Sequence, residues 1–350
     1  MPDTSRTFLL GPLLKGVSRS FYLTMRILPV GMRDPIGLAY LLARAADTIA
    51  DTSLIVPAER LSALLALRAQ VNGTSNDMAP LQNMAAMMAA QQTHSDEKTL
   101  LESLAPAITL LGELDDADRQ AVRDIVSTLS DGMEFDLLTF PDESSGRIGV
   151  LPTMDALDRY TYLVAGCVGE FWTKMTYLHA PGTLKVAAEV MEDRGIRFGK
   201  ALQMTNVLRD CGKDLRIGRC YLPEVLLERF ALRPEALLLP GASLTAKPLL
   251  DVLVRETLAH FKAALDYTLA IPGSAIRLRL ASLWPIIIGL ETLLLLVQND
   301  QWLDPERGSK FARKRVYQMI AKSLVQVPFD GLVRAWVMGL MGKVERQLAA

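Results

Sequence analysis

Polar residues interrupt the apolar pattern of this chain in narrow helical stripes. The first lies in residues 40–51, YLLARAADTIAD, where the spacing i, i+4, i+7, i+11 is occupied by Tyr40, Arg44, Asp47 and Asp51. Side chains with this spacing share one face of an α-helix, and the other positions are almost all apolar or small. A surface helix carries charge over a broad face, so a single stripe predicts a helix that faces inward, toward a polar ligand.

A second stripe lies in residues 198–214, FGKALQMTNVLRDCGKD, and consists of Gln203, Asn206, Asp210 and Asp214. Each stripe thus carries an Asp-x-x-x-Asp pair. If the two helices face each other, four carboxylates converge on one cavity and need cations to be stable. Mg²⁺ suits such carboxylates and completes its coordination with water and phosphate oxygens, which indicates a diphosphate ligand. Direct contacts to its oxygens are expected from Arg19, Arg44 and Arg209. For one stripe alone, an ordinary Arg–Asp salt bridge explains the pattern as well.

Helical periodicity extends over almost every long segment, and no alternating run with hairpin signals is present. We therefore expect an all-α fold and a single domain over residues 1–350. Expected helices cover about 36–50, 57–72, 98–112, 115–140, 153–179, 183–210, 249–271, 275–299 and 309–326, with a last one after Pro328. Within 153–179, Gly166 and Gly169 follow Tyr160 and Tyr162, and either close helix packing or room for a ligand explains these glycines.

Composition narrows the class of function. Lys and Arg number 38 against 39 Asp and Glu, so no overall charge attracts nucleic acid. Three cysteines without a CxxC, and three scattered histidines, favour a reducing compartment and no zinc site. No signal peptide is visible, and the most apolar run, 284–297, is shorter than the ~18 residues of a membrane span, so we expect a buried core helix. These features indicate a cytoplasmic protein, leave peripheral membrane contact open, and leave the oligomeric state unknown.

Several segments resemble the squalene and phytoene synthases in order and spacing, over roughly residues 15–320. They are SRSF at 18–21, YLLARAADTIAD at 40–51, YTYLVAGCVGE at 160–170, and QMTNVLRDCGKD followed by GRCYLP at 203–223. Asp47-Thr48 is more similar to squalene synthases, and the chain most resembles bacterial ones, since the C-terminal anchor of the eukaryotic enzymes is not seen. The resemblance implies an all-helical class I isoprenoid synthase fold around a central cavity, with the Asp motifs on opposite walls.

The resemblance also implies an activity, that of a farnesyl-diphosphate farnesyltransferase in isoprenoid, sterol or hopanoid biosynthesis. Two farnesyl diphosphates would condense head-to-head to presqualene diphosphate, and NADPH would then reduce it to squalene. Mg²⁺ would be held by Asp47, Asp51, Asp210 and Asp214, and Tyr160 would transfer a proton. Diphosphate contacts are implied for Arg19, Tyr40, Arg44, Gln203, Asn206 and Arg219. NADPH contacts are implied for Arg19, Arg44, Arg209, Lys310, Arg313 and Arg315. Phe21 and Tyr160 would stabilise a carbocation through their rings.

The chain departs from the family pattern at Ala50 and Lys213, where an additional acid is usual, so each motif keeps two carboxylates. The basic run that contains Arg313 and Arg315 is also explained as a solvated helix surface. Dehydrosqualene, hydroxysqualene and phytoene remain alternative products. A non-catalytic helical assembly factor is a further alternative, although such a scaffold has no need for four converging carboxylates.

Overall fold

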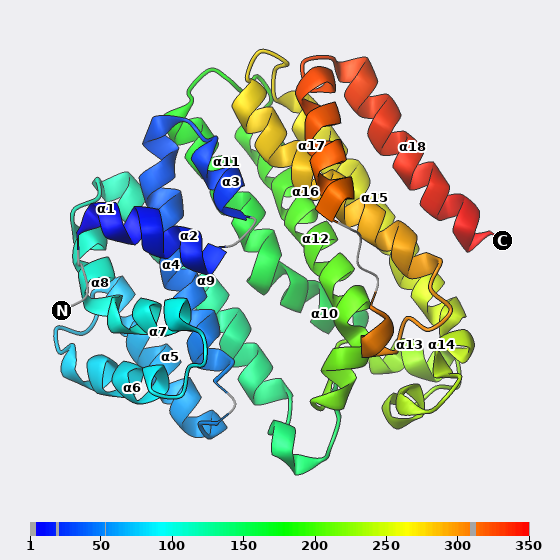
Figure 1. Ribbon diagram of the computed structural model, residues 1–350, viewed down its shortest axis with the longest axis horizontal. Coiled ribbons are helices and arrows are strands. Elements are labelled where there is room, and N and C mark those ends of the chain that lie inside the picture. Colours follow the sequence, from blue (N-terminus) through cyan, green and yellow to red (C-terminus); the bar gives the residue numbers. More distant parts are fainter. Residues whose placement is uncertain (1–4, 19–20, 53, 309–312, 350) are drawn as a thin grey trace. The chain divides into compact units, whose positions relative to one another are not determined.

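The computed structural model describes residues 5–18, 21–52, 54–308 and 313–349 of the protein. Helices dominate this part of the chain, and its strands are limited to β1 (Gly149–Val150) and β2 (Arg219–Cys220), which pair in parallel (Figure 1). The predicted all-α class is therefore confirmed. The chain divides into two compact units, Met1–Leu138 with Lys174–Ala180 (unit 1) and Thr139–Thr173 with Pro181–Ala350 (unit 2). A single domain over residues 1–350 stays a prediction.

Unit 1 is organised around α4 (Val30–Ala50), whose apolar side chains are mostly buried from Met32 onward. Helices α5 (Pro57–Asn72), α7 (Ser95–Glu102) and α8 (Leu104–Gly112) pack against it. The other helices of this unit are α1 (Arg6–Phe8), the π-helical η1 (Leu9–Leu13), α2 (Leu14–Ser18), α3 (Phe21–Arg26), α6 (Ala79–Ala89) and α9 (Asp116–Thr139), which ends at the unit boundary. The helix after Pro57 ends as predicted, because Gly73 adopts a left-handed conformation with φ of 70° that releases the chain from helical geometry.

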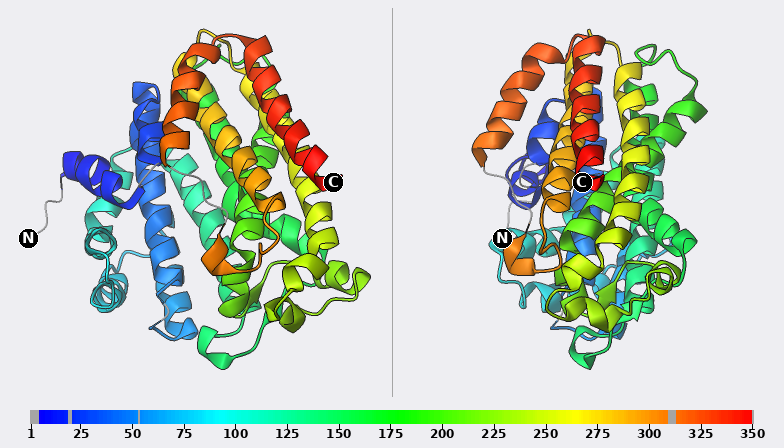
Figure 2. Two further views of the ribbon diagram at one scale, coloured as in Figure 1. Left: turned by 45° about the vertical axis from the view of Figure 1, so that its right-hand side comes forward. Right: turned by 90° about the vertical axis from the view of Figure 1, so that its right-hand side faces the viewer.

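Unit 2 is organised around the long helix α12 (Ala188–Arg216), which packs on α15 (Lys247–Ala270) and α16 (Ile276–Val297). Figure 2 shows α15 and α16 running beside α18 (Asp330–Leu348). The remaining elements are η2 (Glu143–Ser145), α10 (Met154–Thr161), η3 (Tyr162–Gly166), α11 (Cys167–His179), α13 (Glu224–Arg229), η4 (Pro234–Leu238), α14 (Ala242–Thr245), η5 (Pro305–Arg307) and α17 (Arg313–Gln326). The last residues of α11, from Lys174, belong to unit 1.

The expected helix over 153–179 contains a π-helical turn, η3, at the point where its glycines begin. These glycines allow the backbone to touch α12. A Cβ atom added to Gly169 would lie 1.8 Å from the carbonyl oxygen of Gly195, and one added to Gly199 would lie 2.0 Å from that of Ala165. Close helix packing, one of the two explanations left open by the sequence, therefore accounts for Gly169.

Helix α12 extends six residues beyond its expected end at 210, so that Asp214 is helical. The sequence GKDLR does not end the helix. Its glycine, Gly212, stays helical and allows close packing against residue Leu303. A Cβ atom there would lie 2.1 Å from the carbonyl oxygen of Leu303, and Arg216 donates to the same oxygen at 3.1 Å. The second Asp pair is thus carried on one continuous helix.

Helix α16 is long and apolar enough to cross a membrane by length and composition, yet 72% of its most apolar window is buried. Its buried side chains include Leu283, Ile287, Leu290 and Leu293. This agrees with the predicted core helix, since a buried helix of a water-soluble domain passes the same test.

Candidate active site

The stripe on α4 is the partly exposed face of an otherwise buried helix. Its side chains Tyr40, Arg44 and Asp47 are half-buried, and Asp51, which caps the C-terminal end, is exposed. The remaining faces of the helix are buried by apolar packing. They comprise Leu38, Leu41, Leu42, Ala45, Ala46 and Ile49, each at most 1% exposed. The burial of the apolar positions therefore leaves the polar stripe on the partly exposed face of α4.

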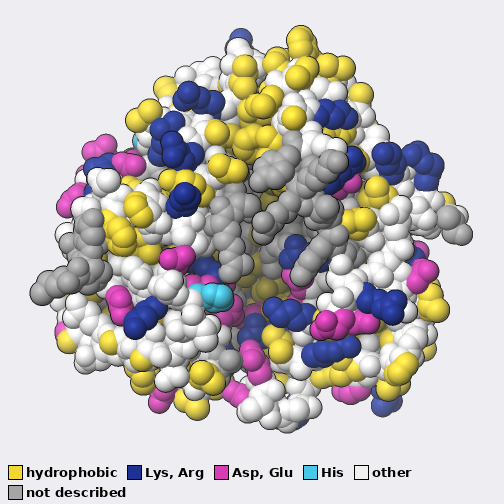
Figure 3. All heavy atoms as spheres, viewed as in Figure 1, with side chains coloured by type: hydrophobic (Ala, Val, Ile, Leu, Met, Phe, Trp, Pro, Cys, Tyr) yellow, Lys and Arg dark blue, Asp and Glu magenta, His cyan; other side chains and the backbone are white. Residues whose placement is uncertain are grey.

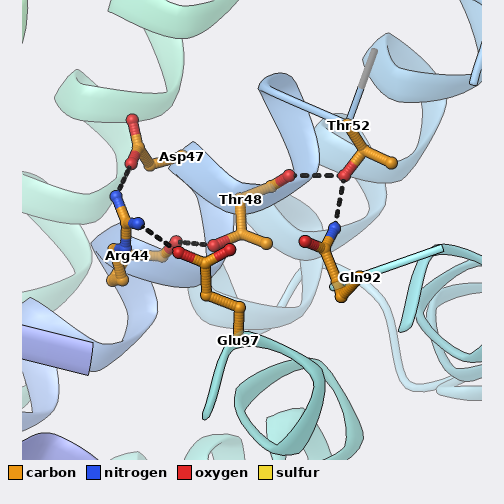
Figure 4. Close-up of polar contacts among 6 residues, drawn as sticks. All are labelled: Arg44, Asp47, Thr48, Thr52, Gln92 and Glu97. Carbon is orange, nitrogen blue, oxygen red and sulfur yellow. Dashed lines mark hydrogen bonds and ion pairs between the residues drawn. The ribbon is translucent and has the colours of Figure 1, made fainter. Parts of the chain in front are cut away.

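Arg44 connects this stripe to a neighbouring helix. It donates to the Asp47 carboxylate and, through Nη2, to Oε1 of Glu97 on α7 at 2.6 Å (Figure 4). The salt bridge within the helix, the simpler explanation of the pattern, is thus present. Sequence reasoning missed Glu97, because an acid in the first turn of a helix is usually a favourable surface charge. Only the fold brings it to the stripe.

Negative charge exceeds positive charge at this end of α4. Arg44 pairs with two carboxylates, those of Asp47 and Glu97, and the nearby Asp51 carboxylate adds a third negative charge. Partial burial and the charge of Asp51 raise the pKa of Asp47 to about 6, although Arg44 opposes the shift. A cation would relieve this repulsion, so the residues present fit Mg²⁺. Within the described residues, no group of three or more His, Cys, Asp or Glu side chains could hold a metal ion by itself.

The C-terminal end of α4 is held by a ladder of hydrogen bonds. Thr48 donates to the Arg44 carbonyl at 2.9 Å, Thr52 donates to the Thr48 carbonyl at 2.7 Å, and Gln92 donates to the Thr52 hydroxyl at 2.9 Å (Figure 4). The buried Arg60 donates to the Ala50 carbonyl at 2.9 Å. The bonds to the Thr48 and Ala50 carbonyls satisfy groups that a helix end leaves without intrahelical partners, and they fix the backbone that carries Asp51.

The stripe on α12 has the same character. Gln203, Asn206, Asp210 and Asp214 are half-buried, whereas Met204, Val207, Leu208 and Cys211 at the intervening positions are buried. Arg209 donates to its neighbour Asp210 from both Nε, at 2.9 Å, and Nη2. The guanidinium is therefore positioned beside the carboxylate before any ligand arrives.

Tyr160 lies in an aromatic and polar environment formed within unit 2. Its side chain is 7% exposed, and its ring stacks on Tyr221 with the centroids 4.6 Å apart. Tyr221 in turn meets the Phe140 ring edge-on at 4.9 Å. Gln203 donates to the Tyr160 hydroxyl at 3.5 Å, and Asn206 donates to Gln203 at 3.4 Å. The structure thus brings Tyr160 together with two residues of the α12 stripe.

Tyr162, the neighbouring alternative for proton transfer, is held differently. Its hydroxyl donates to Glu170 at 2.9 Å. Burial and this carboxylate raise the pKa of Tyr162 to about 12. The Tyr162 hydroxyl is thus engaged by Glu170 and harder to ionise, which makes Tyr162 less suited to accept a proton.

The segment GRCYLP supplies Arg219 and Tyr221 through β2. The pairing of β2 with β1 fixes this short extended stretch beside α12, and Arg219 donates to Glu143 at 3.2 Å. Sequence reasoning missed Tyr221, although it lies two residues after Arg219 in a quoted motif. Alternation along an extended strand places such residues on one face, and this was the available signal.

The described side chains of the predicted NADPH residues pair with carboxylates of the protein. Arg315 donates to Glu291 at 2.6 Å, and Arg44 and Arg209 are paired with the carboxylates given above. Arg19 and Lys310 lie outside the described residues, as does the side chain of Arg313. The NADPH contacts therefore stay a prediction.

The described chain thus combines two acid-bearing helices, a buried tyrosine and an all-α scaffold. The family model of squalene/phytoene synthase matches residues 14–316, and the chain belongs to this family. Squalene synthase of Solanum lycopersicum is 26% identical over 290 residues, which cover 82% of this chain and 64% of that protein. Squalene synthase of Eremothecium gossypii is 26% identical over 316 residues, 89% of this chain and 66% of that protein. The chain thus spans just under two thirds of the length of these relatives.

Solved structures share the fold. TcSQS in complex with a ligand superposes with a TM-score of 0.76 at 20% identity and covers 99% of both chains. A dehydrosqualene synthase in complex with a ligand gives a TM-score of 0.63 at 19% identity over 91% of this chain and 95% of that chain. Synthases with different products therefore share this fold, so the fold alone does not select the product.

Proposed function

We propose that the protein is a squalene synthase, a transferase that condenses two farnesyl diphosphates head-to-head and reduces presqualene diphosphate to squalene. The observation that carries the proposal is the pair of Asp-x-x-x-Asp stripes on α4 and α12, in a chain of the squalene/phytoene synthase family. Curated relatives named squalene synthase favour this product over the alternatives.

The chain's own residues fit recognition of a metal diphosphate. Asp47 and Asp51, and likewise Asp210 and Asp214, are proposed to hold Mg²⁺, whose charge would help the diphosphate to leave. Arg44 and Arg209 lie beside these carboxylates and present several N–H groups, which suits phosphate oxygens. Tyr40, Gln203, Asn206 and Arg219 are proposed to complete the contacts to substrate.

Tyr160 is proposed to move the proton that is lost when the cyclopropane of presqualene diphosphate closes. Its hydroxyl accepts from Gln203, so the hydroxyl oxygen is held while its proton stays directed elsewhere. The stacked rings of Tyr160 and Tyr221 present π faces that stabilise positive charge. The low exposure of this site excludes water, which would otherwise capture a carbocation.

NADPH is proposed because of the similarity to squalene synthases. It would supply the hydride that reduces presqualene diphosphate to squalene. Arg315 is paired with the buried Glu291.

The test is product analysis by mass spectrometry after incubation with farnesyl diphosphate and Mg²⁺, with and without NADPH. Squalene that appears only with NADPH, and presqualene diphosphate or hydroxylated products without it, is the expected result. The same C30 hydrocarbon at the same rate under both conditions would replace squalene synthase by dehydrosqualene synthase. Absence of any magnesium-dependent turnover of farnesyl or geranylgeranyl diphosphate would favour the non-catalytic assembly factor.

A further inference from the structure

One end of unit 2 exposes apolar side chains on two adjoining connections. The loop between α15 and α16 touches the turn between α17 and α18, because a Cβ atom added to Gly273 would lie 2.2 Å from the carbonyl oxygen of Pro328. Figure 3 shows hydrophobic side chains gathered at the upper edge of the view, where Figure 1 places these connections. We call this surface, made of residues 271–277 and 322–334, the apolar tip.

The tip exposes several large apolar side chains. Val325, in the last turn of α17, is 69% exposed, and Phe329, which caps the N-terminus of α18, is 58% exposed. Leu324, Leu332 and Ile276 are also exposed. Single exposed apolar residues are ordinary, but several on adjoining segments mark an interaction surface.

The charges of the tip are cationic. Arg277, Lys322 and Arg334 are exposed, and Asp330 is the sole acid in its two segments. Asp330 accepts from Arg279, whose side chain is 0% exposed. Because Nε and Nη1 of Arg279 find no acceptor among the described residues, the buried guanidinium depends on Asp330 for neutralisation. The one carboxylate of the tip is therefore compensated from inside the protein.

A cationic surface continues along α17 and α18. Lys322 lies over the Trp336 ring, with Nζ 4.1 Å from the ring centroid. Burial and the neighbouring cations Arg315 and Lys343 lower the pKa of Lys322, although Glu291 opposes this. An anionic partner would relieve the repulsion among these cations.

We infer that the apolar tip docks peripherally on an anionic lipid bilayer. Leu324, Val325 and Phe329 enter the boundary between headgroups and acyl chains, while Arg277, Lys322 and Arg334 contact lipid phosphates. Apolar side chains flanked by cations and a tryptophan are the combination that favours a membrane surface. A second copy of the chain fits the tip less well, because a symmetric contact would bring like charges together. The inference does not rest on the proposed reaction.

The test is co-sedimentation of the full chain with vesicles of phosphatidylcholine alone or mixed with phosphatidylglycerol. We expect binding to the mixed vesicles that weakens with added salt. Phe329→Ser should lower the partition coefficient about tenfold, as expected for losing one large buried apolar side chain. Arg334→Gln should lower it about fivefold on mixed vesicles and leave binding to neutral ones unchanged. Leu239→Ser is the matched control, because Leu239 is 63% exposed and lies away from the tip in η4's following loop.

Several results would overturn the inference. They are failure of the unsubstituted chain to bind mixed vesicles, equal binding by the Phe329→Ser variant, and an equal loss in the Leu239→Ser variant. A halved mass in light scattering for Phe329→Ser would assign the tip to self-association instead. Thermal melting of each variant checks that the exposed substitutions leave the fold intact.

Discussion

At the scale of single residues, the cations of the candidate site already have carboxylate partners in the protein. Arg44 pairs with Asp47 and Glu97, and Arg209 pairs with Asp210. Such pairs hold flexible side chains in place, and a metal-bound diphosphate would have to take over part of these contacts. The partner exchange is favourable only when Mg²⁺ neutralises the carboxylates that are released.

Asp47→Asn tests this exchange without an activity assay. The pKa of Asp47 in the folded protein, about 6, lies above the ordinary value, so its ionisation costs stability as pH rises from about 4 past 6. Without metal at pH 8, Asp47→Asn should therefore melt no lower than the unsubstituted protein. Mg²⁺ with inorganic diphosphate should raise the melting temperature of the unsubstituted protein only, and less so as pH falls through about 6.

Asp131→Asn serves as the control for that experiment, because Asp131 is an exposed partner of Arg68 and belongs to neither stripe. Equal stabilisation of the Asp47→Asn variant by Mg²⁺ and diphosphate would contradict the role of Asp47.

Tyr160→Phe separates proton transfer from packing. The ring can keep its stack on Tyr221 while the hydroxyl is lost, so substrate binding and melting temperature should change little. Formation of presqualene diphosphate should fall ~100-fold or more, the typical contribution of a positioned acid or base. Tyr162→Phe is the matched control and should retain most activity, measured by quenched single-turnover assays. Should Tyr160→Phe stay active, the proton would have to leave through a diphosphate oxygen.

At the scale of elements, the hydrophobic period predicted most of the long helices and the polar faces of α4 and α12. It could not predict Glu97 beside Arg44, or Glu291 beside Arg315, because each partner lies on another helix and is chosen by packing. The π-helical turn η3, which packs against α12, was not predicted either.

Gly199→Ala tests that close approach. Alanine is normally the better helix former by ~1 kcal/mol, yet its Cβ would lie 2.0 Å from the Ala165 carbonyl oxygen. The helices would have to separate, and we expect a loss of ~1–3 kcal/mol in the free energy of unfolding. Gly339→Ala, in α18 with no atom within 4 Å of the added Cβ, should instead be neutral or stabilising. Urea unfolding of both variants measures the difference, and equal effects would mean that the α12 contact is loose.

At the scale of the whole molecule, family membership and fold support a shared chemistry, while the product depends on side chains that helical period does not specify. The sequence pattern predicts that Asp47 and Asp210 act together on one substrate, although they lie 163 positions apart in the chain. This prediction concerns cooperation between two motifs, so it needs a measurement that reports on both at once.

A double-mutant cycle with Asp47→Asn and Asp210→Asn provides that measurement. Each substitution alone should slow the first condensation ~100-fold or more, because neutral Asn replaces a charged metal ligand poorly. If both pairs hold Mg²⁺ on the same diphosphate, the first loss already disables the site, so the double variant should be far more active than the product of the two losses implies. Asp124→Asn, at an exposed ion pair with Lys174, should combine with Asp47→Asn multiplicatively and so provides the reference. Multiplicative losses for Asp47 and Asp210 as well would mean that the two stripes work independently, and that the resemblance between them does not reflect a common ligand.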